Sequence, residues 1–342
     1  MKRVRNKCLI ILFVFSITTA LLCACGEKPS EILSRGSEDY GKGKSETTYL
    51  IPQNPSAVLT ELIESYTASR EIPEPMEEEE AQEFIEQAPE EDQLDTSGQN
   101  EISSADELQK MLAWMMDETK TTAKYTLTGG YVFDVDSLGV ALERASREDP
   151  ADGICIGSYG FYDSGTDGTI VLNYDLPTSE LIQMKKDTRD LVKAAMNDLN
   201  VTGQSDPEII KAVNNYLCDQ NTYPSEDKEK YPGNLGGYSS ESRTAYALFH
   251  DHNAVCEGYA RACMLLLNEY GIDCINIWGY AGGAHAWNMV KLDGSWYHVD
   301  VCWNDGSWTR EDYLLLSDQA MSETRTWDTS EYPASAMNSY TF

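Results

Sequence analysis

The chain has 342 residues and a formal net charge of −31, from 57 acidic and 26 basic side chains. This length corresponds to roughly two domains at the usual ~150 residues per domain. The acidity argues against nucleic acid as a partner, and the spacing of the nine cysteines matches no zinc site with paired CxxC ligands.

The N-terminal segment has the features of a bacterial export signal. Basic residues at positions 2, 3, 5 and 7 precede an apolar run that ends at Cys25, which is the order of charge and hydrophobicity in a signal peptide. The final Leu-Cys-Ala-Cys resembles a lipobox, which implies cleavage before Cys25 and diacylation of its thiol. Cys23 fits this pattern less well. The alternative is a transmembrane anchor, for which an apolar run of about 17 residues is marginal.

We therefore expect residues 1–24 to be a lipoprotein signal peptide. The mature protein would be exported and lipid-anchored through Cys25 to the outer face of the bacterial cytoplasmic membrane, because two acyl chains give stable anchoring.

Residues 25–103 are expected to form an acidic tether. Between residues 71 and 106 there are fourteen acidic residues, three prolines, and neither Lys nor Arg. Such a run is most often solvated and disordered, and its self-repulsion would extend it. The alternative is a segment that binds cations or basic partners.

Residues 104–200 are expected to form a smaller α+β leader region without recognisable chemistry. Its helix candidates show apolar residues at helical spacing, and its strand candidates flank a Gly/Asp-rich turn that indicates a hairpin. The three helices are predicted at 105–118, 136–147 and 181–199, and the two strands at 153–162 and 169–175.

Residues 201–342 are expected to form a second domain that carries the chemistry. A helix is predicted to begin at the N-cap Asn253 and to end before Gly271, a favourable residue just beyond a helix. Cys256 would then lie in the first turn, where unsatisfied N–H groups and the helix dipole favour a thiolate. The bland alternative is a buried, unreactive cysteine.

The next segment is predicted to be a β-hairpin. Strand-like residues 285–292 and 295–303 flank Asp293-Gly294, which is a strong signal for a two-residue turn. A one-residue change in the turn would move every side chain of one strand to the other face.

This register places three side chains of chemical interest near one another. His285 and Asp300 share one face as a diagonal pair about 7–8 Å apart at the backbone, within reach of an imidazole–carboxylate hydrogen bond. Cys302 would lie directly opposite His285. It is interpreted either as a small space-filling residue or as a rival, redox-coupled thiol.

The remaining histidines and cysteines are assigned lesser roles. His298 is expected to be a packed or hydrogen-bonded residue, while His250 and His252 are expected to face solvent. After removal of the cysteines at positions 8, 23 and 25 and of a free nucleophile, an odd number remains. This argues against a disulfide framework.

Two stretches, VCEGYARACMLLLNEYGIDC and AHAWNMVKLDGSWYHVDVCWND, strongly resemble the transglutaminase-like superfamily of bacteria. By position in these motifs, Cys256 resembles the nucleophile, His285 the base and Asp300 the orienting acid. The match covers roughly residues 205–320. It implies an α+β, papain-like core, in which a helix with the catalytic cysteine packs on an antiparallel β-sheet with the histidine and aspartate.

The chemistry implied by the resemblance is attack of a thiolate on an amide, which gives a thioester. Water as acceptor gives a peptidase or amidase, which we expect; an amine gives a crosslinking transglutaminase. A different alternative is a non-catalytic module that binds peptide or cell-wall polymer on the same fold. The expected partner is a protein or peptide, such as a cell-wall or surface protein. No metal or cofactor is expected, because no spacing of acidic residues resembles a calcium loop.

Overall fold

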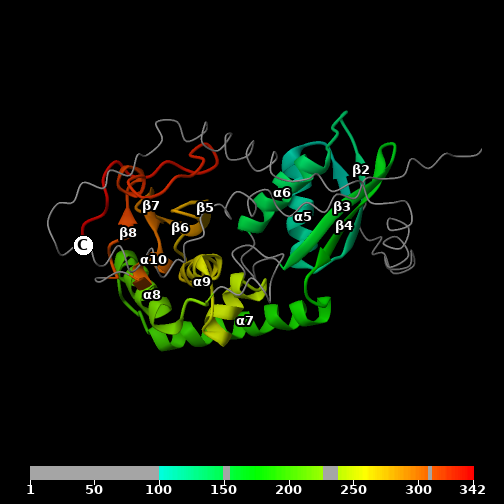
Figure 1. Ribbon diagram of the computed structural model, residues 1–342. Coiled ribbons are helices and arrows are strands. Elements are labelled where there is room, and N and C mark those ends of the chain that lie inside the picture. Colours follow the sequence, from blue (N-terminus) through cyan, green and yellow to red (C-terminus); the bar gives the residue numbers. More distant parts are fainter. Residues whose placement is uncertain (1–99, 149–154, 226–237, 307–309) are drawn as a thin grey trace, which may run out of the picture. The chain divides into compact units, whose positions relative to one another are not determined.

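Figure 1 shows the computed structural model of the protein, which describes residues 100–148, 155–225, 238–306 and 310–342. The predicted signal peptide, Cys25 and nearly all of the predicted tether lie outside these residues. The described chain divides into two compact units, with the division between Leu181 and Ile182. None of the helices in the described residues is long and apolar enough to cross a membrane.

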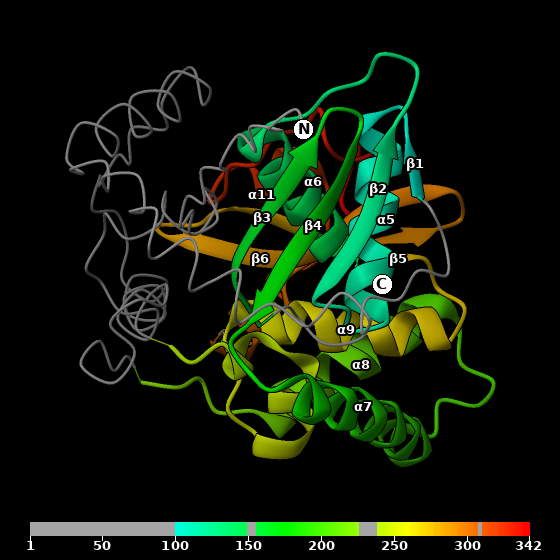
Figure 2. The same cartoon turned by 90° about the vertical axis from the view of Figure 1, so that its right-hand side faces the viewer.

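The first unit is a mixed sheet with two helices. Its strands lie in the order β1-β2-β4-β3, with β1 parallel to β2 and the other pairs antiparallel. Helices α5 and α6 pack against each other on one face of this sheet (Figure 2). The elements are β1 (Asn100–Ile102), α5 (Ala105–Asp117), β2 (Thr122–Leu127), α6 (Val135–Glu148), β3 (Ile156–Ser164) and β4 (Asp167–Tyr174).

The helix predictions in this half follow from apolar periodicity. In α5, Leu108, Met111, Leu112 and Met115 are all buried, and the Ser104 side chain accepts a hydrogen bond from the Glu107 N–H at the N-cap. Helix α7 spans Thr178–Leu199, three residues earlier than predicted at its start.

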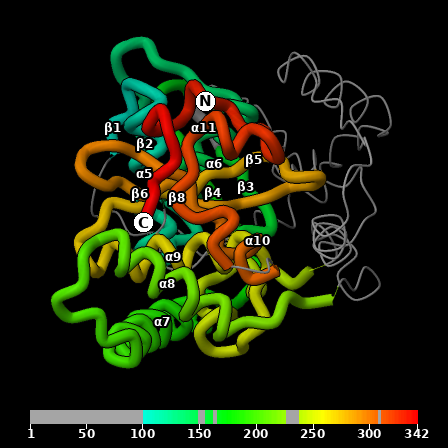
Figure 3. Tube along the Cα trace, turned by 90° about the vertical axis from the view of Figure 1, so that its left-hand side faces the viewer, coloured from blue at the N-terminus to red at the C-terminus, as the bar shows by residue number. Residues whose placement is uncertain are grey.

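The second unit has an antiparallel sheet with strand order β5-β6-β7-β8, covered by helix α9, on which helix α8 packs in turn (Figure 3). Its elements are α8 (Asp206–Gln220), η3 (Glu241–Arg243), η4 (Ala247–Asp251), α9 (Cys256–Glu269), β5 (Cys274–Tyr280), β6 (Ala284–Leu292), β7 (Ser295–Val299), α10 (Val301–Gly306), β8 (Leu314–Leu316) and α11 (Asp318–Met321). A helix packed on an antiparallel sheet is the α+β architecture that the sequence predicted.

Helix α9 is buried between the sheet and the other helices. It contacts β5, β6, α8 and α10, and its apolar face packs into a core that includes Cys263, Leu267 and Val290. Nearly all of its side chains from Gly258 to Leu267 are buried. A helix in this environment holds its first residue in a fixed place, because the interior is close-packed.

The predicted N-cap of α9 is wrong by two residues. The N-cap is Val255, and its side chain makes no capping hydrogen bond. Asn253 instead closes the preceding π-helical turn, since its N–H donates to the Ala247 carbonyl at 3.1 Å. The C-terminal prediction is confirmed: Gly271 follows the helix with φ +79, where a residue with a side chain is disfavoured.

The predicted turn and register of the hairpin are confirmed. Asp293 and Gly294 have φ of +49 and +81, as a two-residue primed turn requires. The ladder pairs Leu292 with Ser295 and Asn288 with Val299. The turn therefore has the two residues on which the predicted placement of His285 and Asp300 on one face depends.

The predicted length of the second strand is wrong. Strand β7 ends at Val299, and helix α10 begins at Val301. Asp300 causes this change: its carbonyl accepts the Asn304 N–H at 3.0 Å and its carboxylate accepts the Trp303 N–H at 3.0 Å, which is the pattern of an N-cap. Cys302 consequently lies on a helix and is not paired opposite His285, whose strand partner is Gly279 of β5.

Candidate active site

Cys256 is the first residue of α9 and is partly exposed. Close packing around this helix start depends on Gly258. A Cβ added there would lie 2.8 Å from the Thr244 carbonyl oxygen and 2.7 Å from the Ala254 Cβ, so a larger residue would push the helix away. The spacing Cys-x-Gly therefore serves to bring the thiol-bearing turn against the preceding segment.

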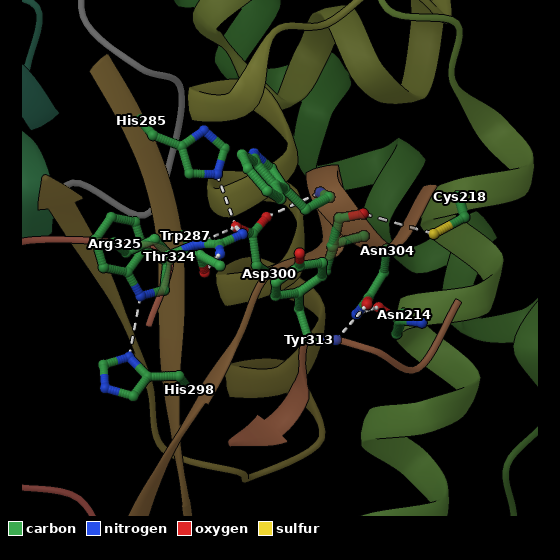
Figure 4. Close-up of polar contacts among 12 residues, drawn as sticks. Asn214, Cys218, His285, Trp287, His298, Asp300, Asn304, Tyr313, Thr324 and Arg325 are labelled. Carbon is green, nitrogen blue, oxygen red and sulfur yellow. Dashed lines mark hydrogen bonds and ion pairs between the residues drawn. The ribbon is translucent and has the colours of Figure 1, made fainter. Parts of the chain in front are cut away.

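His285 lies on β6 and connects the thiol to a carboxylate. Its Nε2 is 2.7 Å from Oδ2 of Asp300, and its side chain is also hydrogen-bonded to Cys256. The imidazole is 8% exposed and Asp300 is fully buried. The structure thus brings together all three residues that the sequence singled out (Figure 4 shows the histidine and the aspartate).

The electrostatics of this group favour a charged imidazole. Burial opposes the charge, but the Asp300 carboxylate and the hydrogen bonds with Asp300 and Cys256 outweigh it and raise the pKa of His285 to about 9. Burial also opposes the ionised form of Asp300, yet the positive charges of His285 and Arg325 hold its pKa well below the usual range. At neutral pH an imidazolium beside a thiol stabilises the thiolate.

Arg325 is a member of this group that the sequence reasoning missed. Its Nε and Nη2 donate to Oδ2 of Asp300 at 3.0 Å and 2.5 Å (Figure 4). It follows Asp300 by 25 residues and stands in no recognisable motif. No local pattern could have identified it, because the contact is made only by the tertiary fold.

Two tryptophans form the apolar walls around the imidazole. Trp287 stacks on His285 with ring centroids 5.9 Å apart and an interplanar angle of 18°, and Trp303 approaches the same ring edge-on at 5.9 Å. Trp287 also donates from Nε1 to Nδ1 of His298 at 3.0 Å. This hydrogen bond places His298 in the role of a packed, hydrogen-bonded histidine.

Cys302 differs from Cys256 in its surroundings. It is buried in the first turn of α10. Burial, followed by the proximity of Cys256 and Asp300, raises the pKa of its thiol well above the ordinary value. A thiol that stays protonated at neutral pH is a poor nucleophile. Along the described chain, the six cysteines are all free thiols.

Tyr223 is a second neighbour that the sequence reasoning did not assign to the site. Its phenol oxygen is hydrogen-bonded to the backbone of Cys256, and burial and the nearby thiols raise its pKa. Its ring packs edge-on against Tyr238 at 5.9 Å. His250 and His252 are exposed and make other hydrogen bonds, with Asp251 and with the Gln220 carbonyl, respectively.

The fold and this group of side chains define a domain in which a helix start presents a cysteine to a histidine and an aspartate of an antiparallel sheet. Residues 193–301 match the family model described as the transglutaminase-like superfamily, and the chain therefore carries a transglutaminase-like domain.

Among curated proteins, the chain is similar to two described as kyphoscoliosis peptidase. It is 26% identical to the mouse protein over 135 residues, which are 34% of this chain and 19% of that protein. It is 24% identical to the human protein over 127 residues, 32% of this chain and 18% of that protein. The matched part thus spans less than a fifth of these relatives' length. A solved structure described as a TGase aligns at 14% identity with a TM-score of 0.29, over 53% of this chain and 50% of that chain.

Proposed function

We propose that this protein is a cysteine-dependent enzyme that attacks peptide or side-chain amides through a thioester intermediate, with hydrolysis as the outcome. The observation that carries the proposal is the placement of His285, which is hydrogen-bonded to both Asp300 and Cys256. These are the contacts of a base that is oriented by a carboxylate and that activates a nucleophile.

In the proposed mechanism the Cys256 thiolate attacks the carbonyl carbon of the amide. The C–N bond then breaks while the His285 imidazolium gives its proton to the departing amine, and a thioester remains on the sulfur. His285, now neutral, takes a proton from water, and the resulting hydroxide attacks the thioester carbon. The C–S bond breaks, the acid is released, and the thiolate–imidazolium pair is restored.

The oxyanion that forms in both steps needs a hydrogen-bond donor. We propose the backbone N–H of Cys256 for this role, because it lies at the start of α9 among the N–H groups that have no partner within the helix. In the free protein the phenol oxygen of Tyr223 is bonded to this backbone. Substrate binding would therefore move or replace this contact.

The choice of acceptor can be tested by product mass. A glutamine-containing peptide is incubated with the protein, with and without a primary amine. Hydrolysis either converts the side-chain amide of the peptide to an acid or cleaves the peptide backbone. Transfer instead adds the mass of the amine to the peptide. We expect hydrolysis in both reactions and no product with Cys256→Ala. Amine incorporation would favour a crosslinking enzyme, and a lack of thioester with every peptide tried would favour a non-catalytic binding module.

Export and lipid anchoring through Cys25 belong to the same proposal, with a protein or peptide at the cell surface as substrate and residues 25–103 as tether. The sequence features that support it are the basic start, the apolar run and the lipobox-like end. Mass spectrometry of the N-terminal peptide from a membrane fraction should find Cys25 at the N-terminus with acyl chains attached. A peptide that retains residues 1–24 would contradict this.

A further inference from the structure

A buried arginine adjoins the proposed catalytic group and is not needed by Cys-His-Asp chemistry as such. Arg325 is 2% exposed, and its two donors meet the same oxygen of Asp300, Oδ2, that accepts from His285. The other carboxylate oxygen, Oδ1, accepts the Trp303 N–H. Burial of a cation is costly unless it is paired, so the position of Arg325 is a specific feature of this fold.

The backbone of Arg325 is fixed to the sheet that carries His285. Its N–H donates to the Met321 carbonyl at 3.2 Å, and its neighbour Thr326 exchanges two backbone hydrogen bonds with Tyr280 at 2.8 Å and 2.9 Å. Tyr280 ends β5, which pairs with β6. The guanidinium and the imidazole are consequently held by adjoining parts of one sheet.

The guanidinium also packs against two aromatic rings and is bonded at its free end. The ring centroids of Trp303 and Tyr313 lie 4.2 Å and 4.3 Å from its central carbon, and the two rings meet edge-on with centroids 5.3 Å apart. Nη1 donates to the Thr324 hydroxyl at 2.6 Å. A planar fork that packs against two perpendicular rings and is bonded at all three nitrogens has one orientation, which lysine could not reproduce.

We propose that Arg325 is a positioning residue of this site, which holds the Asp300 carboxylate in the orientation that His285 needs and shares its charge, so that the imidazolium can give up its proton to the leaving group. The proposal rests on the proposed function. The geometry that points to it is the single carboxylate oxygen bonded to both cationic side chains.

The charge of Arg325 affects how tightly the His285 imidazolium holds its proton. A buried carboxylate that faced only His285 would bind the imidazolium strongly and slow the proton transfer that releases the amine. A second cation on the same oxygen weakens this attraction. Because a nearby positive charge favours the deprotonated form of any group, loss of Arg325 raises the pKa of both His285 and Asp300.

In the described part of the chain, the other titratable groups around this site come from α9, β7 and α10, with Asp318 of α11 bonded to His298. His285 faces Cys256 of α9. Asp300 and Arg325 face His298 of β7 and Cys302 of α10, in addition to each other. Burial lowers the pKa of His298 and raises that of Cys302, so both are neutral near pH 7. Arg325 and His285 are therefore the cations that determine the local charge.

The experiment uses the four histidines of the chain as reporters. The protein is labelled with ¹³C at histidine Cε1, and the resonances are titrated with pH in the wild type, Arg325→Gln and Arg325→Lys; His285→Ala assigns the relevant signal. We expect the His285 midpoint to rise by about one unit in Arg325→Gln. Arg325→Lys keeps the charge and should leave the midpoint near the wild-type value, while the signals of the exposed His250 and His252 stay in place in both variants.

Arg310→Gln is the matched control, because Arg310 also pairs with an aspartate, Asp219, but at the surface. It should leave the His285 midpoint unchanged. A His285 midpoint in Arg325→Gln equal to that of the wild type would overturn the proposal.

Alkylation of Cys256 by iodoacetamide separates this proposal from the proposed function. If the wild type reacts no faster than His285→Ala, the proposed function fails, whereas the titration still reports on Arg325. If Arg325→Gln does not fold, the alkylation rate of Arg325→Lys tests the proposal instead. Lysine cannot hold the Asp300 carboxylate in its place, so alkylation of Cys256 should slow by about tenfold or more. A wild-type rate in Arg325→Lys would overturn the positioning role.

Discussion

Two histidine–aspartate pairs occur on neighbouring strands of the second sheet, and both have a nitrogen–oxygen distance of 2.7 Å. In the pair on β6, the pKa of His285 is raised to about 9. In the pair on β7, the pKa of His298 is lowered. The same bond length therefore accompanies opposite preferences for the proton.

The cause lies in burial and in what else each residue touches: burial lowers the pKa of His298, and its aspartate does not outweigh this. Asp300 is fully buried, whereas the side chain of Asp318 is 38% exposed, so water screens its attraction for His298. Nδ1 of His298 accepts the indole N–H of Trp287, which requires a neutral ring at that nitrogen. An aspartate at hydrogen-bond distance does not by itself make a histidine a base; burial of the acid and a second partner that favours the charged ring are also needed.

The largest expected effect is the loss of the nucleophile or its base. Cys256→Ala and His285→Ala should each reduce amide hydrolysis by about 10⁴-fold or more, and the double variant should be no worse, because the two residues act as a unit. His298→Gln is the matched control on the other pair and should retain activity within about threefold. Rates on a peptide substrate measure this, and additive losses would contradict it.

The next largest effect is expected when the negative charge of Asp300, which orients His285, is removed. Asp300→Asn should lower the hydrolysis rate by about 10²- to 10⁴-fold, since the amide cannot stabilise the imidazolium. It also leaves Arg325 as an unpaired buried cation, at a cost of about 3–5 kcal/mol. Asp318→Asn removes the corresponding acid of the other pair. We expect it to change the rate little, as measured on protein whose folding is checked by circular dichroism.

The two histidines should change stability with pH in opposite directions. His285 has a raised pKa, so its contribution, on the order of 3 kcal/mol, is complete below its ordinary value of 6.5 and is lost as the pH rises towards 9. His298 has a lowered pKa, so its contribution is present above 6.5 and is lost as the pH falls below that value.

Urea unfolding between pH 5 and 9.5 measures both slopes. His285→Ala should remove the alkaline loss of stability, and His298→Gln should remove the acidic loss. If either variant leaves its slope unchanged, the assignment of that histidine's charge is wrong.

The smallest expected effect tests the indole that contacts both histidines. Trp287→Phe keeps a ring against His285 but removes the N–H that His298 accepts. We expect a loss of about 1–3 kcal/mol in the free energy of unfolding, because a buried acceptor loses its donor. Hydrolysis should be nearly unaffected. A large loss of activity would show that the second pair is part of the catalytic machinery.

The sequence predicted those features that depend on local chemistry. The Asp293-Gly294 turn determines the hairpin register without reference to the rest of the fold, and apolar periodicity located helices α5 and α7. The α+β class and the grouping of the cysteine, histidine and aspartate followed from these elements together with the motif resemblance.

Features that depend on competition or on tertiary contacts could not be predicted in this way. The alternation of apolar residues continues past Val299 and predicts a strand to residue 303, but the side chain and carbonyl of Asp300 accept hydrogen bonds from N–H groups that follow in the chain and start a helix. This error placed Cys302 opposite His285. Arg325 reaches Asp300 only through the chain reversal after α11, and no sequence spacing records that contact.

The central claim is that His285 activates Cys256, and thiol labelling tests it most directly. The wild type, His285→Ala and Cys302→Ala are treated with a limiting amount of a thiol-reactive probe at pH 7, and the labelled peptides are identified by mass. We predict rapid labelling at Cys256 in the wild type and in Cys302→Ala, and labelling slower by about 10²-fold in His285→Ala. Labelling at Cys302, or an unchanged rate at Cys256 in His285→Ala, would contradict the account.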